Sequence, residues 1–165
     1  MRTSHVGRLE VSVIGLRCNN FGRALDREGS GRVVQAALDA GMTFFDTADS
    51  YGQARAEAYL GARRGEQPQG RLSMDRYQRF LTDRNFAVVD ELRSFAAARQ
   101  REAVHVALAW LLARPTVPSV TAGATTAAQA VTNAAAADWV LSDEDVAQLD
   151  AIVARFDADA RRLGA

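Results

Sequence analysis

The sequence predicts an α/β domain with parallel strands, and three segments carry this prediction. Val11–Leu16 is an apolar run of the kind that forms a buried strand. Gly31–Ala40 places apolar residues at helical spacing and ends at Gly41, a residue suited to stop a helix. A second apolar run begins at Met42. A strand, a helix and a strand joined in this way form a βαβ unit, which implies a parallel pair with a right-handed crossover.

Further elements precede and follow this unit. A small hairpin with a turn at Gly7 is predicted over Val6–Ile14, and it runs into the first strand. The later pattern predicts helices around one more short strand: helix Ala54–Arg64, helix Asn85–Arg99, helix Glu102–Ala113, strand Val117–Ala122, helix Ala127–Ala137 and a last helix capped by Ser142. The only obvious linker is the polar stretch Gly65–Gly70. We therefore expect a single domain over residues 1–165 with an internal junction near 65–70.

The composition fits a globular domain and argues against several classes of partner. Of the 165 residues 48% are hydrophobic, and the net charge is zero, which gives no electrostatic basis for binding nucleic acid or an anionic membrane. Cys18 is the only cysteine, which excludes an internal disulfide and makes a metal site unexpected. No apolar run has the length of a membrane span. We expect a soluble, cytoplasmic protein that holds no metal.

Every one of the twenty basic side chains is an arginine, so the sequence contains no lysine. The two histidines are His5 and His105. His105 lies in a mostly apolar helical segment, where a lone histidine is more often a partly buried structural residue than a catalyst. A mechanism that requires a lysine cannot run on this chain alone.

Asp46 and Tyr51 form the first candidate site, because the apolar run from Met42 changes abruptly to polar and ionisable side chains there. A phenol can act as a general acid toward a carbonyl oxygen when a nearby cation lowers its pKa, whereas a nearby carboxylate acts in the opposite sense. Asp46 therefore makes chemical sense as the partner of a cation. In the structural alternative, Asp46 caps the next helix or turn and Tyr51 packs at the rim of the fold.

The second candidate site lies where the last predicted strand breaks into a loop of small residues and a helix. Outward-pointing loop amides and the helix dipole would favour a phosphate there. Gln129 and Asn133 are four residues apart, so they share one helix face and could read a base edge. The candidate cofactor-binding residues are Gly123, Ala124, Thr125, Thr126, Gln129 and Asn133. The alternative is an ordinary strand-to-helix loop.

Four blocks of the sequence, in this order, resemble the aldo/keto reductases. They are VSVIGLRCNNFG (Val11–Gly22), ALDAGMTFFDTADSYG (Ala37–Gly52), ALAWLLARP (Ala107–Pro115) and SVTAGATTAAQAVTNAAAA (Ser119–Ala137). The resemblance implies an NADP(H)-dependent oxidoreductase that acts on small aldehydes or ketones. It implies catalytic roles for Asp46 and Tyr51, and it places the cofactor at the second candidate site.

The family fold is a (β/α)8 barrel, and this chain is too short to complete it. Strands three to seven have no counterpart, so the resemblance implies an incomplete (β/α)8 TIM barrel: an N-terminal hairpin plus parallel strands in the order 2-1-8, packed on helices. The second face of this sheet would be the open barrel interior, lined by Val13, Val120 and Phe44 or Phe45. An exposed apolar face with two edge strands predicts self-association.

Family enzymes use an aspartate, a tyrosine, a lysine and a histidine, and the last two have no counterpart here. The resemblance thus implies an enzyme that is inactive or impaired as a lone chain. A reductase would need a surrogate cation, for which Arg17 is the only candidate. A non-catalytic remnant that binds a nucleotide weakly, and an interaction module completed by a partner chain, stay open as alternatives. Arg17, Ala54 and Gln100 also stand where the family often has glycine.

Overall fold

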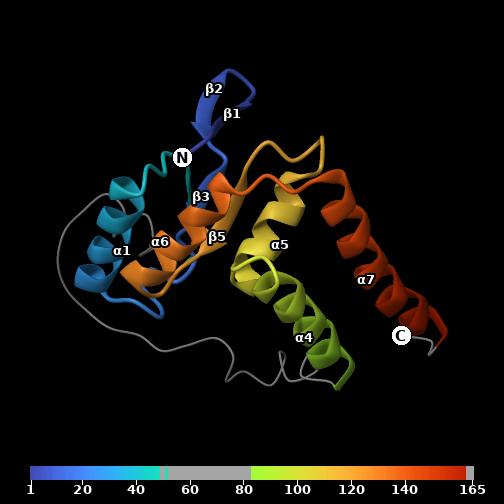
Figure 1. The fold of residues 1–165 in the computed structure, drawn as a ribbon. Coiled ribbons are helices and arrows are strands. Elements are labelled where there is room, and N and C mark those ends of the chain that lie inside the picture. The colour runs from blue at the N-terminus through green and yellow to red at the C-terminus, as the bar shows by residue number, and fades with distance from the viewer. Residues whose placement is uncertain (49–50, 52–82, 163–165) are drawn as a thin grey trace.

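The computed structural model in Figure 1 describes residues 1–48, 51 and 83–162 of the chain. The predicted helix Ala54–Arg64 and the expected junction near 65–70 lie outside these residues. The described part is a mixed α/β structure that contains a two-stranded antiparallel sheet and a three-stranded parallel sheet. The predicted α/β class with parallel strands is therefore confirmed.

The N-terminal hairpin consists of β1 (Thr3–Val6) and β2 (Leu9–Ser12), which pair in antiparallel fashion. Gly7 forms the predicted turn with a φ of +63°, in the left-handed region that favours glycine. The first arm of the hairpin begins earlier than predicted. In Figure 1 the hairpin projects from the body of the protein.

The predicted βαβ unit is formed by β3 (Ile14–Arg17), α1 (Arg27–Asp39) and β4 (Phe45–Asp46), and the two strands are parallel. The helix begins earlier than predicted because Asp26 caps it: the Asp26 carboxylate accepts a hydrogen bond of 2.6 Å from the amide of Gly29. The second strand is only two residues long, shorter than the apolar run from Met42 suggested.

Strand β3 lies at the centre of the parallel sheet. On its other side it pairs with β5 (Val120–Gly123), also in parallel, which gives the order β4-β3-β5. This is the order predicted for the second, first and last strands of the chain. The strand pairing joins segments from opposite ends of the sequence, so the sheet holds the two halves of the chain together.

Helices make up most of the second half of the described chain. They are α4 (Asp83–Ala97), α5 (Ala103–Leu112), α6 (Ala127–Ala135), the short 3-10 helix η1 (Ala136–Asp138) and α7 (Asp143–Arg162). The predicted cap of the last helix is confirmed, because the hydroxyl of Ser142 accepts a hydrogen bond from the amide of Asp145 at 3.1 Å. Within the described residues, no helix combines the length and hydropathy needed to cross a bilayer.

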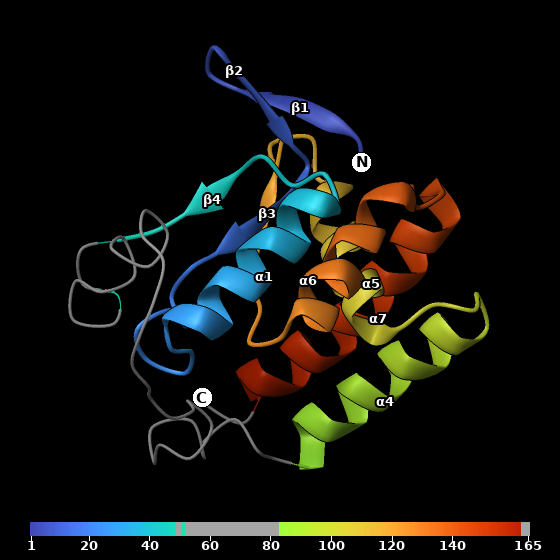
Figure 2. The same ribbon diagram turned by 90° about the vertical axis from the view of Figure 1, so that its left-hand side faces the viewer.

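Two apolar cores hold these elements together. The first lies between the parallel sheet and helices α1 and α6, and Ile14, Leu16 and Phe21 are fully buried in it. The second joins α4, α5 and α7 around residues such as Phe95 and Leu149. Figure 2 shows α1, α6 and α5 side by side on one side of β3. These helices thus cover one face of the sheet.

The apolar residues expected to line an open sheet face lie elsewhere. Val13 is only 5% exposed and belongs to the first core, and Val120 and Phe45 pack against that core. For Val13 and Val120 the prediction is wrong, whereas of the alternatives Phe44 and Phe45 it is Phe44 that packs over Gly15, on the other side of β3. Side chains alternate between the two faces of a strand, so the neighbours of the core residues take the other direction. Arg17 and Gly123 are such neighbours, and they lead to the candidate site.

Candidate functional site

The three parallel strands end level with one another, and this brings the two predicted sites together. Arg17, the last residue of β3, is in register with Asp46 at the end of β4. On the other side it is in register with Gly123 at the end of β5. The carboxyl ends of parallel strands are the usual location of ligand sites in α/β proteins. The residues of both predicted sites therefore meet at the edge where such a site is expected.

Arg17 connects the two members of the first predicted site. Its Nη2 donates a hydrogen bond of 2.7 Å to the phenol oxygen of Tyr51, and its Nε donates one of 3.2 Å to the same oxygen. The same Nε lies 3.6 Å from Oδ2 of Asp46. The guanidinium carbon lies 5.6 Å from the centre of the Tyr51 ring. Asp46 and Tyr51 therefore share one cation.

The surroundings of Arg17 favour its charged form. The hydrogen bond to Tyr51 raises the pKa of the guanidinium above its ordinary value, and the Asp46 carboxylate acts in the same direction. Partial burial opposes this shift without cancelling it. The side chains of Arg17 and Asp46 are 47% and 40% exposed, so this cation is reachable from solvent.

In the second predicted site the polar side chains bind parts of the protein itself. Thr126 caps α6, because its hydroxyl accepts a hydrogen bond of 3.2 Å from the amide of Gln129. Oε1 of Gln129 in turn accepts from the amide of Thr125 at 2.7 Å and from the Thr125 hydroxyl at 2.9 Å. Nδ2 of Asn133 donates to the carbonyl of Gly123 at 3.3 Å. The Thr125 amide, expected to point outward, is thus taken by Gln129.

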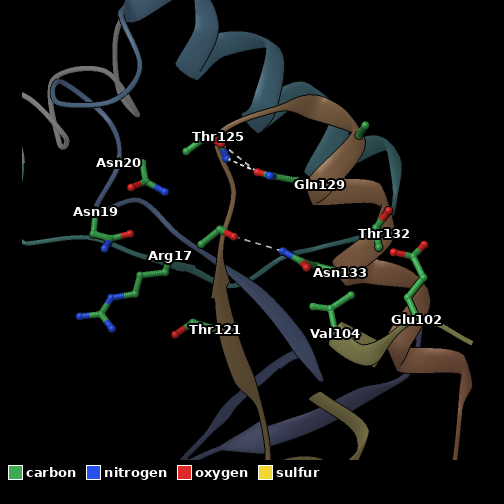
Figure 3. Close-up of a pocket in the computed structure, with 12 residues that line it drawn as sticks. Arg17, Asn19, Asn20, Glu102, Val104, Thr121, Thr125, Gln129, Thr132 and Asn133 are labelled. Carbon is green, nitrogen blue, oxygen red and sulfur yellow. Dashed lines mark hydrogen bonds between the residues drawn. The ribbon is translucent and has the colours of Figure 1, made fainter. Parts of the chain in front are cut away.

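One pocket of about 690 Å³ lies between Arg17 and the second predicted site (Figure 3), and neither Asp46 nor Tyr51 lines it. Its lining comprises Arg17, Asn19, Asn20, Glu102, Val104, Thr121, Gly123, Thr125, Ala128, Gln129, Thr132 and Asn133. In Figure 3 Arg17, Asn19 and Asn20 lie on one side of the pocket, and Gln129 and Asn133 lie on the other. Of the predicted cofactor residues, Ala124 is buried below the pocket surface and Thr126 serves as the helix cap.

Asn19 and Asn20 are pocket residues that the sequence reasoning missed. The amide of the Asn20 side chain donates to the carbonyl of Ala124 at 3.3 Å and so ties the loop after β3 to the loop after β5. Asn19 is only 6% exposed, and its side-chain oxygen accepts no hydrogen bond within the described residues. A buried polar atom without a partner is costly. The signal in the sequence was the pair of carboxamides directly after the first strand.

The pocket has the size of a small-molecule site and a partly polar lining. Its volume lies in the range of small-molecule sites, roughly 300–1,000 Å³. The oxygen of Asn19 can accept from a ligand hydroxyl or amide, and Gly123 leaves room against Asn19 and Asn20 that a side chain would fill. Arg17 supplies positive charge at one side, while Glu102 supplies negative charge at the other.

His105 and Cys18 are buried residues with structural roles. His105 is 8% exposed, its Nδ1 accepts from the amide of Glu102 at 3.2 Å, and its Nε2 lies 2.9 Å from the carbonyl of Thr132. The prediction that His105 is structural is confirmed. Cys18 is fully buried, and burial, together with the Asp46 charge, raises the pKa of its thiol to about 12. Within the described residues, no three potential ligands gather to hold a metal ion.

A parallel sheet with polar residues at the carboxyl ends of its strands, beside a pocket, defines an α/β protein with a candidate ligand site. Comparison with family models adds the particular family. The model of the Aldo/keto reductase family matches residues 14–71 and 61–154. This chain therefore belongs to the aldo/keto reductase family, of which it is a short member at 165 residues. Among curated proteins, none matches the chain.

Proposed function

We propose that this chain is an NADP(H)-dependent oxidoreductase that reduces small aldehydes or ketones. The family supports the reaction class. The observation that carries the proposal is the register of Asp46, Arg17 and Gly123 across three strand ends. Arg17 lines the pocket and donates a hydrogen bond to the phenol oxygen of Tyr51. The phenol is therefore held next to the pocket that the predicted cofactor residues line.

In the proposed reaction Tyr51 is the proton donor. Its hydroxyl gives a proton to the carbonyl oxygen of the substrate, so that an O–H bond forms as the carbonyl double bond is reduced. NADPH, when bound, supplies the hydride that the carbonyl carbon receives. Asp46 holds the cation beside the phenol and keeps the local charge balanced.

The residues proposed to hold the cofactor are those of the β5–α6 loop and the loop after β3. The segment Gly123–Thr126 lies at the N-terminus of α6, which favours an anion such as a phosphate. Gln129 would release the Thr125 amide when a phosphate binds there. Asn19 would accept a hydrogen bond from the cofactor, which would give its buried oxygen a partner.

We propose that turnover is slow, because neither histidine lines the pocket to orient the carbonyl. His105 is committed to Glu102 and Thr132, and His5 lies on β1 of the N-terminal hairpin. The direct test follows the oxidation of NADPH in the presence of an aromatic aldehyde, with Tyr51→Phe as the matched control. We expect slow, Tyr51-dependent oxidation. Separately, a calorimetric titration measures NADPH binding. Failure to bind NADPH at millimolar concentration overturns the proposal.

A second candidate function is that of an interaction module completed by a partner chain. We propose that the sheet is an incomplete (β/α)8 barrel, because its outer strands, β4 and β5, pair with no further strand within the described residues. The partner is either a chain that carries further strands or a second copy of this chain. Light scattering of the purified protein tests self-association. A monomer at micromolar concentration that binds and oxidises NADPH removes this candidate.

A further inference from the structure

We propose that Arg17 is a positioning residue that fixes the phenol of Tyr51 as a proton donor. The inference rests on the proposed function, and it assigns a role that the reaction class alone does not assign. A phenol that gives up its proton becomes negatively charged, and a fixed cation beside the oxygen stabilises that charge. The chain has no lysine to supply it.

The hydrogen-bond geometry sets the direction in which Tyr51 can act. Two N–H groups of one guanidinium point at the same phenol oxygen, at 2.7 and 3.2 Å. They occupy the oxygen as an acceptor, so the hydroxyl hydrogen has to point away from Arg17. A planar guanidinium holds such a pair of bonds more rigidly than an ammonium group. Tyr51 is thereby left to donate.

Arg17 is itself held in place from two sides. Its Nε faces Oδ2 of Asp46 at 3.6 Å, and Asp46 is its in-register neighbour on β4. On the other side its Nη2 and Nε donate hydrogen bonds to the phenol oxygen of Tyr51. The guanidinium therefore lies between the carboxylate and the phenol.

The charge of Arg17 is permanent over the pH range in which a protein stays folded, because a guanidinium does not lose its proton there. When Tyr51 gives its proton to the carbonyl oxygen, the O–H bond of the phenol breaks and a phenolate remains. Arg17 stabilises this phenolate and does not transfer a proton to it. The phenolate is reprotonated by water from the open side of the site, where Arg17 is itself exposed.

The test compares Arg17→Met, which removes the charge at similar length, with Arg17→Lys, which keeps a charge. Arg32→Met is the matched control, because Arg32 is an exposed arginine of α1 that pairs with Glu28 away from the pocket. We expect kcat to fall at least about tenfold in Arg17→Met. It should recover in part in Arg17→Lys and stay unchanged in Arg32→Met. The pH profile of kcat should shift to higher pH in Arg17→Met only.

A second readout does not need turnover. NMR assigns the Nε–H resonance of Arg17 as the side-chain signal that is lost in Arg17→Met. We expect Tyr51→Phe to shift this resonance, because it removes the phenol oxygen that accepts a hydrogen bond from Nε. An unchanged resonance overturns the assignment. If the parent binds no NADPH and shows no turnover but the resonance shifts, the proposed function fails and the assigned contact stands.

Discussion

Gly41 and Gln100 end helices α1 and α4 in the same left-handed conformation, with φ values of +83° and +55°. At both ends the following residue donates its amide to a carbonyl five residues back, from Met42 to Ala37 and from Arg101 to Ala96, each at 2.9 Å. This helix stop favours glycine. Within the described residues, Gln100 is the only non-glycine residue with a positive φ. Its side chain therefore strains a motif that Gly41 forms without strain.

Replacing Gln100 by glycine should stabilise the protein. We expect Gln100→Gly to raise the free energy of unfolding by about 1 kcal/mol, since it removes the strain of a left-handed non-glycine residue. The measurement is urea unfolding followed by circular dichroism. The converse change, Gly41→Ala, should lower stability by at least as much, because the new Cβ also lies 3.1 Å from Cβ of Met1. A destabilised Gln100→Gly variant would contradict the reading of this helix end.

A methyl group at Gly15 should separate two strands of the sheet. A Cβ at this position would lie 2.7 Å from the carbonyl oxygen of Phe44, which accepts the hydrogen bond from the amide of Leu16. We expect Gly15→Ala to cost about 1–3 kcal/mol of the free energy of unfolding. Gly31→Ala is the control, because nothing lies within 4 Å of a Cβ there and helix α1 gains a better helix former. Equal stability of the two variants would refute the packing argument.

The thiol of Cys18 should be unreactive in the folded protein. It is fully buried, and its pKa is raised to about 12, so almost no thiolate is present at neutral pH. We expect Ellman's reagent to label Cys18 only after unfolding. Because the folded pKa is above the ordinary value of 9.0, the protonated thiol favours the folded state below pH 9, and this contribution is lost as the pH rises toward 12. Rapid labelling without denaturant would contradict this.

The pair of Arg99 and Asp145 should contribute to acid sensitivity. Arg99 joins the end of α4 to α7 through a 2.5 Å contact between its Nη2 and Oδ1 of Asp145. Burial acts to raise the pKa of Asp145, but the bonds from Arg99 and Ser142 outweigh it and lower the pKa below 3.8. The carboxylate therefore stabilises the fold above about pH 4, and its contribution is lost as the pH falls through the folded pKa.

This acid dependence is measured by comparing the parent protein with Asp145→Asn. The stability difference should be about 1 kcal/mol at pH 7 and should shrink below pH 4. Asp90→Asn serves as a control, because Asp90 pairs with Arg93 on an exposed helix surface. A difference for Asp145→Asn that stays constant down to pH 3 would show that the charge has no such role.

A methyl group at Gly123 should weaken cofactor binding more than it weakens the fold. Its Cβ would lie 3.4 Å from the side chains of Asn19 and Asn20, at the wall of the pocket. The backbone at Gly123 does not require glycine, since its φ is not among the positive ones. We expect Gly123→Ala to unfold near the parent denaturant concentration and to bind NADPH at least about tenfold more weakly. Unchanged NADPH affinity would place the cofactor elsewhere.

The order of the parallel strands could be predicted from the sequence. Apolar runs and glycine helix ends mark the strands and helices, and the four blocks that resemble the family give the order of the strands in the sheet. The sequence was also sufficient for the structural role of His105. Element boundaries were less predictable. Helix α1 begins before its periodic apolar residues, at a cap that Asp26 supplies from within a polar, glycine-containing segment. Val13 and Val120 were assigned to the wrong face because alternation alone does not say which face the helices cover.

The side-chain contacts at the candidate site could not be predicted from the sequence. Arg17 and Tyr51 are 34 residues apart, and only the pairing of β3 with β4 brings them together. The absence of lysine leaves Arg17 as a candidate cation, but it gives no indication of the geometry of that cation. The bond from Thr125 to Gln129 depends on a rotamer that no spacing rule specifies. The roles of Asp46 and Tyr51 in catalysis stay a prediction.

The central position of β3 has a consequence for how the chain folds. Its pairing with β4 joins neighbours in the sequence, so this unit can form while the chain is still being synthesised. Its pairing with β5 joins distant segments, and that step requires closure of a long loop. Until β5 is made, one edge of β3 is available to other strands in the cell. Chaperone binding to nascent chains that stop before Val120 should therefore exceed binding to the finished protein.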